Sequence, residues 1–361
     1  MASFGTFATA RRQPAVPLRP VLDPAGWEPE ELLATDDWIY RFTESDLAEL
    51  EAAIDKAQKN AVPIVTLRRE DFPLPRLSSI LHDVRSELLF GRGITVLRGL
   101  PVGDMGRERA AMAYFGMGLH IGKPNSQNAH GHLLGHVRDF GRSYKDPNFR
   151  GYQSNATMSF HCDHSDFVGL LCMQPAKSGG ESRVASAVTL HNRMLAERPD
   201  IVEALTHEYY WTRHGEVPPG KKAWKKQPIF GFAEGYFSAR GASNYIHKAQ
   251  ALPDVPRMTP LDFEALDLYQ KMVGECAADI AFERGDIQLL HNNVMQHSRR
   301  EFSDWPEPKR KRHLYRLWLS AGVNARPIPE EMRENFQGIY VAGYKPRIVI
   351  DPELAEEAMV S

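Results

Sequence analysis

The sequence predicts an α+β fold that is mainly β: a double-stranded β-helix, or jelly roll, with helices inserted at the edges of its sheets. Short apolar runs separated by turn residues recur from residue 151 to residue 319, as expected for strands. Runs with helical spacing are fewer and lie between or before them. The 361 residues, 42% of them hydrophobic, suffice for one large core, and no Ser/Gly-rich or highly charged linker divides them.

We expect a single domain over residues 41–330, preceded by an N-terminal tail or clamp (1–40) and followed by a C-terminal extension (331–361). Residues 1–22 contain arginines and no acids, which weakly resembles an organelle transit peptide. The surrounding prolines instead favour a tail that lies over the domain surface. The cytoplasm is therefore the expected location.

Helices are predicted where apolar residues recur every three or four positions. Two of these segments also carry start signals: Thr43-Glu44-Ser45-Asp46 resembles a capping box, and Thr259-Pro260 places a cap before a first-turn proline. The predicted helices cover residues 43–57, 77–89, 107–117, 190–206 with a break near Pro199, and 259–276.

Strands are predicted where β-branched and aromatic residues cluster between turns. Ala233-Glu234-Gly235 is typical of a hairpin turn, and Gly179-Gly180 of a tight turn with positive φ. The predicted strands are 94–98, 156–163, 168–173, 183–187, 228–232, 236–240, 287–290, 294–297 and 313–319.

Bulk composition excludes several classes of partner. A formal net charge of −2 gives no electrostatic basis for binding nucleic acid, and basic runs such as residues 221–226 are local. No apolar stretch is long enough to cross a bilayer. The three cysteines form no C-x-x-C pair, which indicates a reducing compartment rather than a disulfide framework.

The segment Ala156 to Asp163 ends in the pair His161-x-Asp163. In a strand, residues i and i+2 point to the same side, so an imidazole and a carboxylate converge there. Two histidines and one carboxylate on one face of an Fe(II) ion leave the opposite positions open for O₂ and a co-substrate. The pair is half of such a site, and a second histidine must come from elsewhere.

A histidine-rich segment offers an alternative metal site. His130, His132 and His136 lie close together, but neither an H-E-x-x-H pattern nor a cysteine partner accompanies them. We therefore expect these histidines to be solvated or to lie behind a site, with Gln127 and Asn128 as possible pocket residues.

Four motifs occur in order along the chain: His161-x-Asp163, the turn Gly179-Gly180-Glu181-Ser182, Gly285-Asp286 before the segment Asn293-x-x-x-His297, and Arg312-x-x-x-Arg316. Together, over roughly residues 90–325, they resemble the taurine dioxygenase and 2,4-dichlorophenoxyacetate dioxygenase superfamily of Fe(II)- and 2-oxoglutarate-dependent oxygenases.

This resemblance implies that His161, Asp163 and His297 bind iron and that Arg312 binds the distal carboxylate of 2-oxoglutarate through its planar fork. Arg316 would lie near the keto-acid end or the substrate. Ser182, where the family commonly has threonine, could donate to the carboxylate. The implied reaction uses O₂ to oxidise an unactivated C–H bond, most simply by hydroxylation, and releases succinate and CO₂. Asp163 argues against halogenation, since family halogenases replace this carboxylate with a small residue.

The substrate is expected to be small, and arginines near the predicted mouth favour a carboxylate or other anion. Arg213 and Arg240 fit equally well as surface salt-bridge partners. The candidate substrate contacts are Gln127, Tyr152, Asn155, Arg213, Arg240 and Asn293. Two other functions stay open: an iron oxidase that does not use 2-oxoglutarate, and a non-catalytic jelly-roll module that binds a metal or ligand. Homo-oligomerisation is possible.

Overall fold

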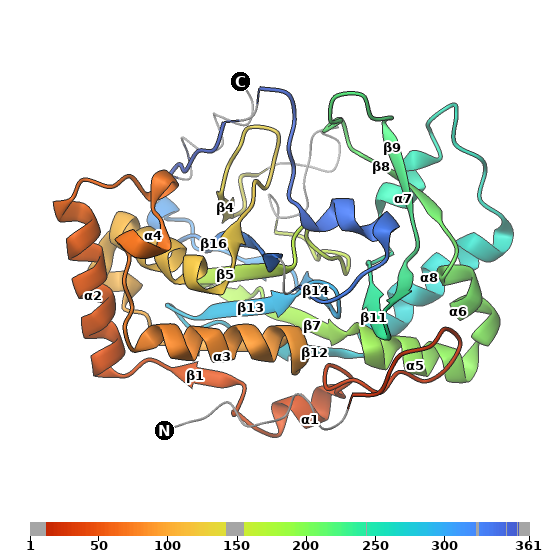
Figure 1. Cartoon of the computed structure of the whole chain (residues 1–361), viewed down its shortest axis with the longest axis horizontal. Helices are drawn as coiled ribbons and strands as arrows, with labels where there is room; N and C mark the ends of the chain where they lie inside the picture. The colour runs from red at the N-terminus through yellow and green to blue at the C-terminus, as the bar shows by residue number, and fades with distance from the viewer. Residues whose placement is uncertain are drawn as a thin grey trace.

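A computed structural model describes residues 12–141, 155–242, 244–322, 325–343, 345–351 and 353. Its central feature is a seven-stranded sheet with the order β1-β2-β13-β5-β16-β3, in which β4 also pairs with β16 (Figure 1). Its strands are β1 (Ile39–Arg41), β2 (Ile94–Arg98), β3 (Lys123–Pro124), β4 (Leu134–Val137), β5 (Phe167–Gln174), β13 (Ile287–His291) and β16 (His313–Ser320). The pair β1–β2 is parallel and the other pairs are antiparallel.

A smaller antiparallel sheet has the order β12-β7-β14. It consists of β12 (Ala277–Ile280), β7 (Ser182–Ser186) and β14 (Met295–Arg299). Three further two-stranded pairs are β8 (Tyr209–Thr212) with β9 (Trp224–Gln227), β10 (Phe230–Ala233) with β11 (Tyr236–Ala239), and β6 (Ser178–Gly179) with β15 (Phe302–Ser303).

Helices cover the sheets in two groups. On one side of the large sheet, α2 (Glu44–Lys59), α3 (Leu77–Phe90) and α4 (Val102–Ile121) share a buried apolar cluster with β2, β5, β13 and β16 (Figure 1). Beside the small sheet, α5 (Ala187–Glu197), α6 (Pro199–Leu205) and α8 (Pro260–Glu275) share a second cluster with β7 and β14. The short helices are α1 (Pro29–Leu33) and α7 (Asn244–Ala249), and the 3₁₀ segments are η1 (Ile64–Thr66), η2 (Arg69–Asp71), η4 (Pro308–Arg310) and η6 (Glu330–Phe336).

The expected combination of sheets and helices is confirmed as a mixed α/β architecture, in which the helices are more than insertions at the edges of the sheets. The longest elements are helices: α4 has 20 residues and α2 and α8 have 16 each, whereas the longest strands have 8. Both predicted caps are confirmed. Thr43 and Thr259 each accept a hydrogen bond from the backbone of the third helical residue and are reciprocated by an aspartate. The helix predicted from Arg107 begins earlier, at Val102, with non-helical backbone at Gly106.

The N-terminal segment contributes to the core rather than lying only on the surface. Val21, Ala25 and Trp27 are buried, and the Trp27 indole donates to the carbonyl of Arg92 at 2.9 Å. Among the described residues, no helix has the length and apolar character needed to span a membrane.

Alternation along β16 decides which side chains face the helices and which face the interior of the site. Tyr315, Leu317 and Leu319 belong to the cluster with α2–α4. Arg316 and Trp318 therefore point to the opposite face, where they line a cavity. The strand pattern thus carries an arginine into the centre of the molecule.

The motif Gly285-Asp286 is a structural support at the start of β13. Gly285 has φ +90°, and a Cβ there would lie 2.0 Å from the carbonyl oxygen of Leu100. The Asp286 carboxylate accepts two hydrogen bonds from Arg98, at 3.0 and 2.8 Å. The pair connects β13 to the end of β2 and so fixes the strand that leads to His297.

Candidate metal centre

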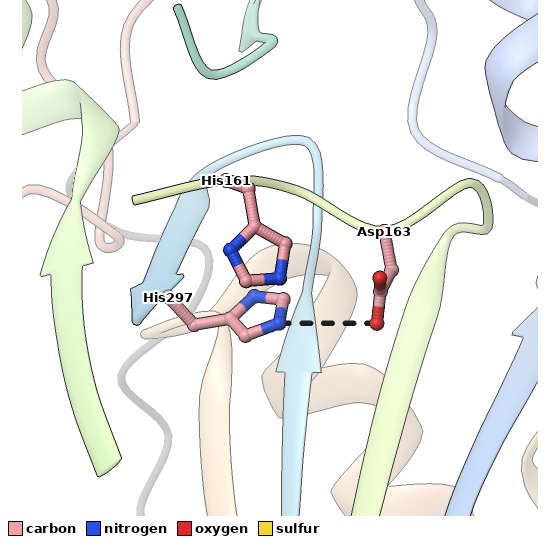
Figure 2. A group of neighbouring side chains, drawn as sticks. All are labelled: His161, Asp163 and His297. Carbon is pink, nitrogen blue, oxygen red and sulfur yellow. Dashed lines mark ion pairs between the residues drawn. The ribbon is translucent and has the colours of Figure 1, made fainter. Parts of the chain in front are cut away.

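The structure brings His161, Asp163 and His297 together. One ligand atom from each lies within 4.8 Å of the others, and His297 Nε2 is 3.8 Å from Asp163 Oδ2 (Figure 2). His297 comes from β14 of the small sheet, whereas His161 and Asp163 precede β5 of the large sheet. Within the described part of the chain, this is the group of histidine, cysteine and carboxylate side chains whose spacing suits a metal ion.

The expected strand over residues 156–163 is wrong; the segment has a single bridge, between His161 and His297. The backbone N–H of Met158 bonds to the carbonyl of Arg299 at 3.1 Å, and His161 and His297 exchange two bonds at 3.0 Å. From Met158 to His161 the first segment advances three residues, whereas β14 advances only two, from Arg299 to His297. The first segment thus contains one extra residue, which makes the backbone bulge and interrupts the pairing of strands. The convergence of His161 and Asp163 arises from this irregular segment, not from strand alternation.

Hydrogen bonds orient the imidazole of His161 for metal binding. Its Nδ1 lies 3.0 Å from the carbonyl oxygen of Ser159, which can only accept, so Nδ1 carries the proton and Nε2 keeps its lone pair. Burial lowers the pKa of His161 and lowers that of His297 to about 3. Both rings are therefore neutral at physiological pH, as a metal ligand must be.

Asp163 is held by three partners. Arg316 Nη1 donates to both carboxylate oxygens at 3.2 and 3.4 Å, Asn292 Oδ1 accepts from the backbone N–H at 3.2 Å, and Arg240 Nη1 donates to the backbone carbonyl at 2.9 Å. Burial raises the pKa of Asp163, but the charge of Arg316 is the largest of the opposing effects, and the net pKa lies below its usual value. The carboxylate is ionised, and the donor set fits a divalent iron ion.

A small cavity beside His161 and His297 has side chains suited to the predicted co-substrate. His161, His297, Ser182, Arg312 and Arg316 are among its lining residues. Arg312 is buried, Nη1 has no hydrogen-bond partner among the described residues, and Nη2 makes only a 3.4 Å contact with the Gly180 carbonyl. Burial lowers the pKa of its guanidinium to about 10, yet it stays protonated. A buried, incompletely bonded guanidinium is suited to a carboxylate.

Ser182 and Arg316 are engaged within the protein. The Ser182 hydroxyl donates to Gln288 Oε1 at 2.8 Å. Arg316 binds Asp163 and also donates from Nε to Gln127 Oε1 at 2.8 Å. Both residues line the small cavity, but their polar atoms hold the walls of the site.

Comparison with known proteins decides the family. The model of the Taurine catabolism dioxygenase TauD, TfdA family matches residues 58–318. The chain belongs to this family. It is therefore a non-haem iron, 2-oxoglutarate-dependent dioxygenase, as the motif order predicted.

Two curated relatives of this TauD/TfdA chain extend over nearly its whole length. FR-33289 synthase of Streptomyces rubellomurinus is 29% identical over 335 residues, which are 90% of this chain and 97% of the relative. Taurine hydroxylase-like protein SAT17 of Stachybotrys chartarum is 28% identical over 331 residues, 88% of this chain and 84% of the relative.

Solved structures share the fold of this TauD/TfdA chain. Asparagine oxygenase in complex with Fe(II), 3-hydroxyasparagine and succinate has a TM-score of 0.62 and 20% identity, with 84% of this chain and 100% of that chain covered. The oxygenase OrfP with Fe, succinate and (3S)-hydroxy-L-Arg has a TM-score of 0.58 and 13% identity, with 79% and 95% covered.

A larger cavity of about 890 Å³ opens on the other side of the TauD/TfdA metal centre. His161, Asp163 and Arg316 form its inner end. His164 stacks on Trp318, with ring centroids 6.1 Å apart, and both contribute to an aromatic wall. A cavity of this volume, in contact with the ligands, is suited to a small organic substrate.

The sequence-predicted substrate contacts divide into two groups. Arg213 and Arg240 line the large cavity. The other described candidates, Gln127, Asn155 and Asn293, line neither of the two cavities. Gln127 lies behind Arg316 and accepts a hydrogen bond from it. Asn155 is exposed, with its carbonyl accepting from the backbone N–H of Phe302, and Asn293 is buried and bonded to the His291 ring at 3.0 Å. Tyr152 lies outside the described residues.

The histidine-rich segment serves packing rather than the metal group. The described residues that form that group do not include His132 or His136. His136 Nδ1 contacts His313 Nε2 at 2.9 Å, and the His132 ring contacts the Asn128 amide at 3.0 Å.

Sequence reasoning missed most of the residues that line the large cavity, among them Lys225 and Glu334. Lys225 lies in a run that resembles a solvated basic stretch. Its register, however, places it opposite Trp211 on the β8–β9 hairpin, and cross-strand partners share a face. A hairpin prediction over residues 209–227 could have found it. Glu334 lies in η6, where no local pattern marks it.

Proposed function

We propose that the protein uses Fe(II), O₂ and 2-oxoglutarate to hydroxylate an unactivated C–H bond of a small, carboxylate-bearing substrate, with release of succinate and CO₂. The observation that carries this proposal is the His161–Asp163–His297 group at the contact of two cavities. One cavity presents the incompletely bonded Arg312, and the other presents Arg213 and Arg240.

The roles of the residues follow from their contacts. His161, Asp163 and His297 would hold the iron, which supplies the oxygen-activating chemistry when bound. Arg312 would bind the distal carboxylate of 2-oxoglutarate. Arg316 fixes the Asp163 carboxylate at 3.2 Å and so keeps it in place as a ligand. A substrate bound in the large cavity, which His161 and Asp163 line, would exclude water from the reacting centre.

Hydroxylation is supported by the similar proteins, which include a taurine hydroxylase-like protein and oxygenases in complex with hydroxyasparagine or hydroxyarginine. We also propose that the large and small sheets are the two layers of a double-stranded β-helix, because β14 and β16 contribute His297 and Arg316 to the same site from different sheets.

The test begins with anaerobic titration of Fe(II) and 2-oxoglutarate, followed by the visible metal-to-ligand absorption band. A screen of small carboxylates and amino acids, including L-asparagine, L-arginine and taurine, then seeks compounds that perturb the band and stimulate succinate formation. Succinate should require both Fe(II) and 2-oxoglutarate. Asp163→Ala should abolish it while circular dichroism stays unchanged, and His130→Ala serves as the matched control outside the metal group.

Two results would overturn the proposal. Product formation without 2-oxoglutarate would indicate an iron oxidase. Metal binding without an absorption band or O₂ consumption at any substrate would indicate a non-catalytic binding module.

A further inference from the structure

The C-terminal segment 330–340 forms part of the wall of the large cavity. It comprises η6 and the residues that follow, and eight of its residues line the cavity: Glu330, Glu331, Arg333, Glu334, Gln337, Gly338, Ile339 and Tyr340. The backbone N–H groups of Gly338 and Ile339 donate to the carbonyls of His164 and Ser126, both at 2.9 Å. The segment is thus attached to the protein immediately next to the metal-ligand segment.

Arg213 joins this segment to the β8–β9 hairpin. Its Nη2 donates to the Glu334 carboxylate at 2.8 Å, and only 6% of the Arg213 side chain is exposed, against 38% for Glu334. Arg213 Nε and Nη1 are buried and have no hydrogen-bond partner among the described residues. The Glu334 carboxylate therefore uses only part of the hydrogen-bonding capacity of Arg213. Buried donors without a partner cost folding free energy, so a further acceptor would stabilise this arginine.

Positive charge accumulates at the same end of the cavity. The pKa of Lys225 is lowered to about 7. Burial is the main cause, Arg240 and Arg213 also lower the pKa, and Glu334 raises it. Three basic side chains and one carboxylate therefore lie within electrostatic reach of one another, and all four line the cavity. A second anionic group would reduce their repulsion and could accept from Arg213.

We propose that Arg213 and Lys225 form a subsite for the anionic end of the substrate, and that Glu334 is a positioning residue that links this subsite to segment 330–340. Binding of the anion and seating of the segment over the cavity are then coupled, because both depend on Arg213. The substrate class rests on the proposed function, whereas the coupling is measurable without turnover.

The experiment measures hydrogen–deuterium exchange of residues 330–340 in the full-length anaerobic Fe(II)–2-oxoglutarate complex. The probe is sodium acetate, compared with sodium chloride at equal ionic strength. Acetate should slow exchange of the segment in the wild type. Glu334→Gln should accelerate it without acetate by about fivefold, the factor that corresponds to ~1 kcal/mol. Glu208→Gln, which breaks the exposed Lys226–Glu208 pair of the same hairpin, should have no effect.

Arg213 variants separate the two halves of the proposal. In the Arg213→Met protein, residues 330–340 should exchange fast with or without acetate. Arg213→Lys keeps a cation for Glu334 but loses the additional donors. Residues 330–340 of this variant should therefore still exchange slowly, but acetate should have little further effect. If Arg213→Met does not fold, Arg213→Lys alone tests the anion subsite. Wild-type exchange in Glu334→Gln, or an acetate effect that survives in both Arg213 variants, would overturn the proposal. Succinate assays report separately on the proposed function.

Discussion

Replacing Arg312 with methionine should stabilise the protein without ligands while destroying its affinity for 2-oxoglutarate. The guanidinium is buried, and its Nη1 lacks a partner among the described residues. A charge in this position costs folding free energy that only a bound carboxylate offsets. Methionine fills much of the same space without a charge.

The magnitude follows from the pKa of Arg312, which burial lowers from 12.5 to about 10. At about 1.4 kcal/mol for each pKa unit, the charged form is destabilised by roughly 3 kcal/mol. Because the pKa is lower in the folded state than in the unfolded state, the loss of folding free energy is complete below pH 10. It disappears as the pH rises from 10 toward 12.5. Losing the contact with the Phe302 ring, 5.2 Å away, offsets about 0.5–1 kcal/mol, so a net gain of about 2 kcal/mol is expected at pH 7.

Co-substrate binding should change in the opposite direction. Two charge-assisted hydrogen bonds of about 1.5–3 kcal/mol each correspond to about 10²- to 10⁴-fold weaker binding of 2-oxoglutarate. Urea unfolding of the metal-free protein measures stability, and the anaerobic absorption titration measures affinity. Arg310→Met, in the same basic run but half exposed, should change neither. An Arg312→Met protein that is less stable than the wild type and still binds 2-oxoglutarate normally would refute the reasoning.

Three further predictions concern the surroundings of the site. Gln127→Leu removes the acceptor of the 2.8 Å bond from Arg316 Nε, so urea unfolding should show a loss of about 1–3 kcal/mol and Fe(II) titration about tenfold weaker binding; unchanged Fe(II) affinity would contradict this. Gly180→Ala puts a Cβ at φ +78°, 3.1 Å from Arg312 Nε, so we expect a cost of about 1–2 kcal/mol and weaker 2-oxoglutarate binding by calorimetry, with wild-type affinity as the contrary result. For an anionic substrate, KM should rise as pH increases through about 7, because Lys225 loses its proton there; Lys225→Arg should flatten this profile, and parallel profiles would exclude the role.

Local sequence patterns determined where α2 and α8 begin and which side of β16 carries Arg316. The caps at Thr43 and Thr259 satisfy N–H groups within the same turn, so three or four adjacent residues contain all the information. The four-residue spacing of Arg312 and Arg316 likewise predicts a shared side of a strand, and both line the small cavity. The order of motifs, which depends only on residue identity, predicted the three side chains that the structure brings together.

The combination of sheets and helices could be predicted, but the weight of the helices was underestimated, because short strands outnumber them in the sequence pattern while the helices are individually longer. The segment before Asp163 was also misjudged. Its apolar residues favour a strand, but the hydrogen bonds of Met158 and His161 to β14 require an extra residue that breaks the ladder. The strand propensity of these residues cannot predict this register, because the partner strand lies more than 130 residues further along the chain.

The sequence by itself therefore predicted which residues would hold iron and co-substrate, since these predictions follow from residue type, order and local spacing. Only the tertiary structure decided which polar side chains line the large cavity. It placed Asn293 against His291 instead of the cavity, and it joined Arg213 to Glu334 across 121 residues. The physical reason is that such contacts depend on how separate elements pack, and packing is a property of the whole chain rather than of any window of it.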